Sequence, residues 1–122
     1  APDTYQLAPD GSWTPQVRGV GDRVFSALLS QHLDVPVAMI NAAHAGTGLV
    51  WPGDGSRGYW LDPSPTGLYA GAKARILGVT PKVEFVLWAN GEADAVGRVG
   101  TEAHAAGLAS LAAMIASDFG NP

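Results

Sequence analysis

Two short apolar runs constrain how this chain can fold: VPVAMI at 35–40 and VEFVLWA at 83–89, each followed directly by an asparagine. Runs of this length, rich in β-branched and aromatic residues, are typical of buried strands. A helical pattern lies between them, and strands that alternate with helices pair in parallel through right-handed crossovers. Both strands would then end at one edge of the sheet, where open α/β folds bind ligands.

Three segments have the apolar spacing of helices. The first, RVFSALLSQHL, follows Gly21-Asp22, and the third runs over 101–119. In the second, Ser64-Pro65 has the pattern of an N-cap followed by proline at the first helical position, and Gly78 ends the helix. The first 16 residues carry three prolines and little periodicity. We therefore predict an irregular lead-in over 1–20, without a strand in its first 16 residues, and a domain segment over 21–122.

Composition excludes several classes of protein. The 122 residues suffice for one domain, and with 15% charged residues and a net charge of -4 there is no basic stripe to bind nucleic acid. The chain has no cysteine, which removes disulfides and thiolate chemistry. No apolar run reaches the ~18 residues that span a bilayer, so we expect no membrane partner. Because the chain starts at Ala1, we interpret it as a processed product or part of a longer chain.

The loops after the two predicted strands carry the candidate chemistry: Asn41–Gly48 and Asn90–Asp94. Gly46 lacks a Cβ, so its backbone N–H can approach a reacting atom closely, and the Asn90 amide offers a second donor. Two donors aimed at one point stabilise a carbonyl oxygen as it becomes anionic. These loops therefore predict an oxyanion hole formed by Gly46 and Asn90.

Three stretches in this order, VPVAMINAAHAGTGLVW, GLYAGAKARILG and VEFVLWANGEADA, resemble a known family. The chain is similar, over about residues 25–111, to the central part of the sialate O-acetylesterase and acetylxylan-esterase group of SGNH hydrolases. The resemblance implies a three-layer α/β/α sandwich with parallel strands, present here as a partial domain that other segments of the same domain complete. It also implies serine-dependent hydrolysis of acetyl esters on a carbohydrate, without metal or cofactor.

The resemblance also implies roles for individual residues. Gly46 matches the oxyanion glycine of a GGT turn, and Asn90 stands where the family usually has glutamine. Trp51 matches the tryptophan that follows this turn and implies a flat surface for a sugar ring. Glu92 would support the loop by accepting backbone hydrogen bonds. The remaining matches to the motifs imply support of the site and are Thr47, Gly91 and Asp94; Ala93 replaces the common serine.

The chain departs from this family at its two most important blocks. The family's nucleophilic serine lies in a G-x-S-like block after a first strand, and its catalytic histidine lies in a D-x-x-H block, and neither block is found in the sequence. An alternative is therefore a non-catalytic module that binds glycan or belongs to a larger assembly, such as a virion or cell-surface structure. We favour an extracellular, periplasmic or virion-associated location over a cytoplasmic one.

Several residues have a structural interpretation beside the functional one. His44 is a candidate substrate contact or base, although a lone histidine in such a loop more often bonds to backbone. His104 is predicted to pack, partly buried, along the last helix, and His32 suits the carboxyl end of the first helix. Glu92, Asp94 and His104 lack metal-ligand spacing, so no metal site is predicted. Further candidates with structural alternatives are Ser56 as a turn residue, and Tyr59 and Trp60 as a sugar platform or a local core.

Overall fold

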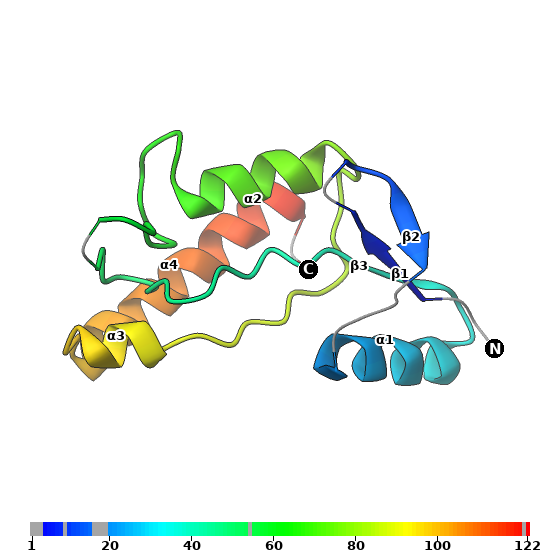
Figure 1. Cartoon of the computed structure of the whole chain (residues 1–122), viewed down its shortest axis with the longest axis horizontal. Helices are drawn as coiled ribbons and strands as arrows, with labels where there is room; N and C mark the ends of the chain where they lie inside the picture. The colour runs from blue at the N-terminus through cyan, green and yellow to red at the C-terminus, as the bar shows by residue number, and fades with distance from the viewer. Residues whose placement is uncertain (1–3, 9, 16–19, 54, 121) are drawn as a thin grey trace. The chain divides into compact units, whose positions relative to one another are not determined.

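The computed structural model describes residues 4–8, 10–15, 20–53, 55–120 and 122 and divides the chain into two compact units. The first unit is Ala1–Ala43 and the second is His44–Pro122. In chain order the described elements are β1, β2, α1 and β3 in the first unit and α2, α3 and α4 in the second (Figure 1).

A three-stranded sheet in the order β2-β1-β3 organises the first unit. β1 (Thr4–Leu7) and β2 (Trp13–Pro15) pair antiparallel, whereas β1 and β3 (Val37–Met39) pair in parallel. The connection between β1 and β2 is closed by Asp10, whose Oδ1 accepts hydrogen bonds from the Ser12 backbone at 2.9 Å and from the Ser12 hydroxyl at 2.7 Å.

The prediction that the first 16 residues contain no strand is therefore wrong, because β1 and β2 both lie there. The Asp10-Gly11 turn supplies the reversal that a hairpin needs, and Gly11 adopts a φ of 84°. Pro15 is tolerated because β2 is an edge strand, where a missing N–H leaves no ladder partner unsatisfied. Pro15 therefore lies in an edge strand rather than in an irregular segment.

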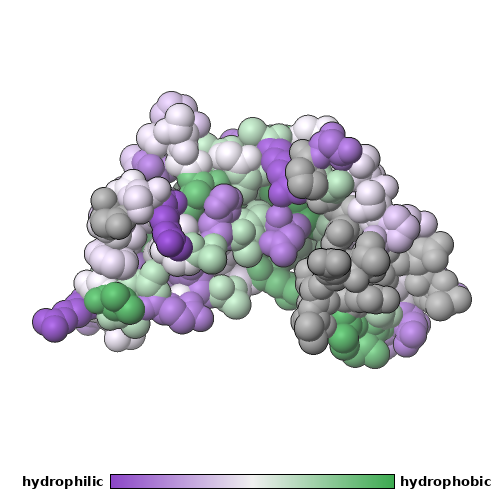
Figure 2. All heavy atoms as spheres, in the orientation of Figure 1, coloured by the Kyte–Doolittle hydropathy of each residue, from purple (hydrophilic) through white to green (hydrophobic). Residues whose placement is uncertain are grey.

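The predicted first helix is confirmed as α1 (Val20–Leu33), with His32 in its last turn as expected. α1 contacts β3 and β1, and the fully buried Ser30 donates a hydrogen bond from Oγ to the Val35 carbonyl at 2.6 Å. Hydrophobic atoms are also visible at the surface in the area of α1 (Figure 2), where Leu28 is 60% exposed. β3 is not buried on both faces, since Val37 is buried and Ala38 is exposed.

The second unit is built from three helices and a long loop. α4 (Thr101–Phe119) matches the predicted helix and ends at Gly120, whose φ of 79° is the left-handed conformation that terminates helices. α2 (Leu68–Leu77) lies beside α4 (Figure 1), and Asp118 accepts hydrogen bonds from Tyr69 Oη at 2.8 Å and Lys73 Nζ at 2.6 Å. α3 (Glu92–Val96) is a short helix that was not predicted as such. The buried apolar side chains of this unit are Leu49, Trp60, Tyr69, Leu111 and Phe119.

The second helix does not start at Ser64-Pro65. Ser64 instead begins a turn, in which its carbonyl accepts a hydrogen bond from the Gly67 N–H at 3.0 Å. Gly67 is extended, with φ -63° and ψ 159°, so the helix begins at Leu68. The predicted end at Gly78 is confirmed.

The predicted strand over 83–89 is also wrong, because these residues have no regular secondary structure. A β-strand forms only when a neighbouring strand pairs with it. Among the described residues of the second unit, β-type pairing is limited to the isolated bridge between Gly48 and Tyr59. Val86 and Leu87 are 42% and 57% exposed. The three-layer sandwich consequently remains a prediction, and the described residues show one of its two predicted strand ends, at β3.

Candidate functional site

The loop over residues 44–63 folds back on itself and has its own buried centre. The backbone N–H groups of Trp60 and Leu61 donate to the carbonyls of Gly48 and Leu49, both at 3.0 Å. Thr47 is 4% exposed; its hydroxyl donates to the His44 carbonyl at 2.7 Å and accepts from Trp60 Nε1 at 3.2 Å. The loop is therefore a fixed element, as expected for a long ordered loop in a compact unit.

A single carboxylate, Asp94 on α3, holds one side of this loop. Its Oδ2 accepts the Leu49 N–H at 2.9 Å, and its Oδ1 accepts the N–H groups of Val50 at 3.1 Å and Trp51 at 2.8 Å. Asp94 is 2% exposed. A Cβ on Gly48 would lie 2.7 Å from Asp94 Oδ1, so a glycine is required where the loop passes the carboxylate.

The electrostatics of Asp94 favour the ionised form. Burial by itself raises the pKa of this carboxyl, but the hydrogen bonds from three backbone N–H groups and from His104 outweigh burial and hold the pKa below its ordinary value. A buried carboxylate is stable only when its oxygens are well supplied with donors, and Asp94 has four. The carboxylate is a structural anion that organises the loop around it.

His104 on α4 supplies the fourth contact of Asp94. Its Nδ1 lies 2.9 Å from Asp94 Oδ2, and its side chain is 24% exposed. The ring also lies against Gly91, where an added Cβ would be 3.9 Å from Cε1. His104 is partly buried as predicted, but its position is set by the hydrogen bond with Asp94 rather than by apolar packing alone. The hydrogen bond orients the imidazole with Nδ1 toward the carboxylate.

Glu92 does not have the supporting role that the family resemblance implied. It is exposed, and it makes no hydrogen bond among the described residues, whereas Asp94 two positions later accepts three from the loop backbone. The short helix α3 explains the difference, because residues two apart on a helix point to different sides. The acid that supports the loop is therefore Asp94.

The structure brings Asn90 to the loop that contains Gly46. Asn90 Nδ2 donates to the Thr47 carbonyl at 3.0 Å, which joins the two segments that sequence analysis paired. Gly46 has a φ of 73°, a conformation that favours glycine. Asn90 Oδ1 is buried and has no hydrogen-bond partner among the described residues. An amide nitrogen carries two protons, and one hydrogen bond from Nδ2 is found among the described residues.

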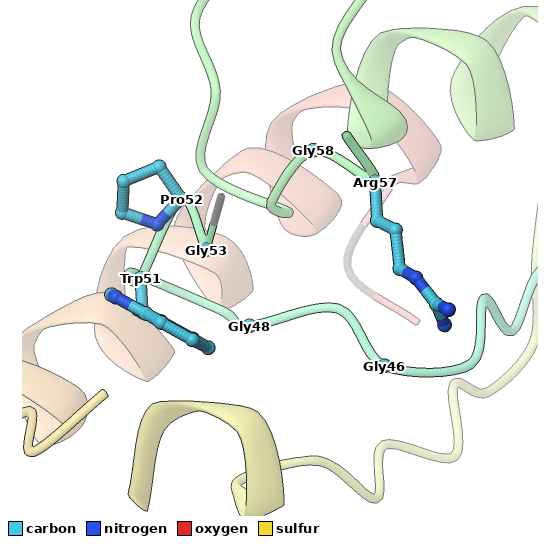
Figure 3. A pocket seen from close by; sticks show the side chains of 7 residues that line it. All are labelled: Gly46, Gly48, Trp51, Pro52, Gly53, Arg57 and Gly58. Carbon is cyan, nitrogen blue, oxygen red and sulfur yellow. The ribbon is translucent and has the colours of Figure 1, made fainter. Parts of the chain in front are cut away.

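A pocket of about 310 Å³ opens on this loop (Figure 3). Trp51, Pro52 and Arg57 line it together with four glycines: Gly46, Gly48, Gly53 and Gly58. The indole of Trp51 packs on the backbone of Gly97, where an added Cβ would lie 2.4 Å from the ring. Trp51 thus forms an aromatic wall of the pocket, and its contact with a sugar ring stays a prediction.

Arg57 is a pocket residue that sequence reasoning missed. Figure 3 shows its side chain reaching toward Gly46, at the end of the pocket opposite Trp51. Arg57 Nη1 donates to the Ala45 carbonyl at 3.3 Å, and a Cβ on Gly46 would lie 2.7 Å from the same nitrogen. A signal was present in the sequence, because Arg57 is the lone lysine or arginine between positions 43 and 63.

Other candidate residues lie in or beside the loop. His44 is exposed, and its ring meets Trp60 edge to face, with centroids 6.3 Å apart. Trp60 in turn meets Trp88 at 5.2 Å, so Trp60 belongs to a local core. Tyr59 is half-buried and Ser56 is exposed. Within the described ranges, no group of three or more potential metal ligands occurs, and none of the helices is long and apolar enough to cross a membrane.

In comparisons with known proteins, no family model, no curated protein and no solved structure matches this chain.

Proposed function

We propose that this chain forms the oxyanion-stabilising part of a carbohydrate O-acetylesterase of the SGNH type. In this proposal the Gly46 N–H and the free proton of Asn90 Nδ2 donate to the carbonyl oxygen of an acetyl ester as it becomes anionic. The observation that carries the proposal is the hydrogen bond from Asn90 Nδ2 to the Thr47 carbonyl at 3.0 Å, because it keeps the amide beside the Gly46 turn.

The supporting residues act through the loop. Asp94 orders the backbone at positions 49–51, and Trp51 presents its ring to the adjoining pocket. The proposal gives no residue of this chain the role of nucleophile. A serine and its histidine would come from other segments of the same domain, and the reaction would need neither metal nor cofactor.

The test is hydrolysis of p-nitrophenyl acetate by the protein in its full length. Asn90→Ala is expected to lower kcat by roughly 100-fold with little change in KM, since one oxyanion donor is lost. Asn90→Gln restores the amide found in the family and should retain most activity. Glu102→Gln, an exposed change on α4, is the control. Unchanged kcat in a folded Asn90→Ala protein would overturn the assignment.

Gly46 is a less direct test of the same site. A side chain at this position would meet Arg57 Nη1 and would also strain a backbone with φ of 73°, so Gly46→Val changes more than the oxyanion donor. A loss of activity in that variant alone would not distinguish these causes. The Asn90 variants are therefore the deciding test of the proposed oxyanion hole.

A second candidate is a glycan-binding module without catalysis. Its support is that Asn90 Nδ2 already donates to the Thr47 carbonyl of the neighbouring loop, as expected of a purely structural amide. Under this alternative the full-length protein would bind saccharides and leave acetyl esters intact. The same hydrolysis assay separates the two candidates.

A further inference from the structure

We propose that a buried water molecule links Trp88 Nε1 to Asn90 Oδ1 and makes Trp88 a positioning residue for the Asn90 amide. Within the described part of the chain, these two side-chain atoms are buried and no protein group pairs with either of them. One is a hydrogen-bond donor and the other is an acceptor. The bridge itself does not depend on the proposed esterase function, whereas its effect on catalysis rests on that function.

The backbone brings the two side chains to the same side of the chain. Residues 85–90 run without a turn or bend between α2 and α3 (Figure 1), and residues two apart in an extended segment point the same way. At a rise of about 3.3 Å per residue, the Cα atoms of Trp88 and Asn90 are about 6.6 Å apart. One water molecule bridges such a span, because each of its two hydrogen bonds covers about 2.9 Å.

Both side chains belong to the local core of the neighbouring loop. Trp88 meets Trp60 edge to face with centroids 5.2 Å apart, and Trp60 is 6% exposed. Trp60 Nε1 donates to the Thr47 hydroxyl at 3.2 Å, and Asn90 Nδ2 donates to the carbonyl of the same threonine at 3.0 Å. Trp88, through Trp60, and Asn90, directly, are therefore both held around one buried threonine.

Water is the ligand that fits these two atoms. The bridging molecule has to accept from the indole N–H and donate to the amide oxygen, which a hydroxyl group does and a simple ion does not. Buried waters typically make about three hydrogen bonds to polar groups that are otherwise unpaired. The Thr47 carbonyl already accepts from Asn90, and its second lone pair supplies the third partner. A single water thus removes the cost of two buried, unpaired polar atoms.

The bridge fixes which way round the Asn90 amide lies. In the observed orientation Nδ2 faces the Thr47 carbonyl, and Oδ1 receives the proton of the water that Trp88 holds. The reversed amide would set its oxygen against the Thr47 carbonyl oxygen, and the water could no longer donate to it. Trp88 therefore acts through the water to keep Nδ2, the proposed oxyanion donor, beside the Gly46 turn.

The direct test is NMR of the full-length protein with isotope-labelled tryptophan. We expect a rotating-frame Overhauser contact between the Trp88 indole N–H and a long-lived water. In Asn90→Leu the water loses its acceptor, so the contact should disappear, and Trp13→Phe in the first unit should leave it in place. A wild-type Trp88 indole that contacts another protein group instead of water, or contacts neither, would overturn the inference.

Kinetics test the positioning role. Trp88→Phe removes the indole donor and keeps an aromatic ring against Trp60. The kcat for p-nitrophenyl acetate should fall roughly fivefold with KM unchanged, as expected for the loss of one neutral hydrogen bond that orients the amide. In an Asn90→Ala background the same change should lower kcat no further, because the amide is gone. Equal effects of Trp88→Phe in both backgrounds would contradict the positioning role.

The two readouts separate this inference from the proposed function. A water contact at Trp88 in a protein that does not hydrolyse acetyl esters would remove the esterase function and leave the bridge standing. Hydrolysis by a wild-type protein without the water contact would remove the bridge and leave the esterase function standing. The wild-type contact also decides the question if Trp88→Phe does not fold.

Discussion

His104 Nδ1 on α4 and Asp94 Oδ2 on α3 lie 2.9 Å apart, and the same carboxylate accepts three successive backbone N–H groups of the loop at 49–51. Two helices and the loop over residues 44–63 are thus joined at one buried anion. These hydrogen bonds fix the backbone of the loop that lines the pocket. Substitution of Asp94 is therefore the most direct test of the structure.

Asp94→Asn should destabilise the protein by roughly 3 kcal/mol, because the buried N–H of Leu49 and the partly buried N–H groups of Val50 and Trp51 lose a charged acceptor. Urea denaturation followed by tryptophan fluorescence measures the change. Glu92→Gln neutralises an exposed acid on the same helix and should shift stability by less than about 0.5 kcal/mol. Equal effects of the two variants would contradict the role of Asp94.

Ionised Asp94 should make the free energy of unfolding depend on pH in the acidic range. Its pKa in the folded protein is below the ordinary value of 3.8, so the unfolded chain binds the proton more readily. The stabilisation is complete at pH well above 3.8 and is lost as the pH falls through the lower pKa of the folded state. Asp118 has a lowered pKa as well, because Lys73 and Tyr69 donate to it.

Because Asp118 also contributes at acidic pH, the quantity to measure is the difference in unfolding free energy between the wild type and Asp94→Asn. The gap in unfolding free energy should be constant from about pH 7 to about pH 5 and should narrow below the ordinary pKa. A gap that widens on acidification would have the wrong sign for a carboxylate with a lowered pKa.

Gly97→Ala should destabilise the protein by about 2 kcal/mol through overpacking against the Trp51 indole. The backbone does not cause this cost, since Gly97 has φ -72° and ψ 0°, which alanine adopts freely. In a Trp51→Ala background the same change should be nearly neutral, and the double-mutant cycle measures the coupling. Gly71→Ala, in α2 with nothing within 4 Å of the new Cβ, should instead stabilise by about 0.7 kcal/mol.

The contact between α2 and α4 depends on Asp118. Tyr69→Phe removes the hydroxyl that donates to Asp118 at 2.8 Å and should cost about 1 kcal/mol. Lys73 is 40% exposed, so Lys73→Met should cost less, and its effect should decline in high salt. Thermal unfolding at low and high salt compares the two. If salt reduced the effect of Tyr69→Phe as much as that of Lys73→Met, the assignment of a salt-insensitive hydrogen bond to Tyr69 would be wrong.

Sequence reasoning succeeded where periodicity decides structure. The apolar stripe predicted α4, and the helical spacing after Asp22 predicted α1. It failed at 83–89, where an apolar run without a neighbouring strand stays irregular, and at Tyr5 and Pro15, which pair across a hairpin despite the surrounding prolines. Strand formation depends on partners distant in sequence, and a local pattern does not reveal them.

The candidate site was predicted in part for a similar reason. The motif match predicted that the loops containing Gly46 and Asn90 lie close together, and the hydrogen bond from Asn90 to Thr47 joins these two segments. The motif assigned loop support to Glu92 because spacing alone does not tell which side of a short helix faces the loop. Asp94, two residues later, faces it instead. Arg57 was missed because an arginine in a glycine-rich loop has no motif of its own.

The hydrogen bonds from three consecutive amides to Asp94 also have a consequence for loop length. Adding or deleting one residue between Gly48 and Trp51 would shift the spacing of the amides relative to a carboxylate that cannot follow. The tip at Pro52–Arg57 has no such anchor to Asp94 among the described residues. Natural or engineered diversity around the pocket should therefore accumulate by changes in the length of the tip, while the stretch that precedes it keeps its size.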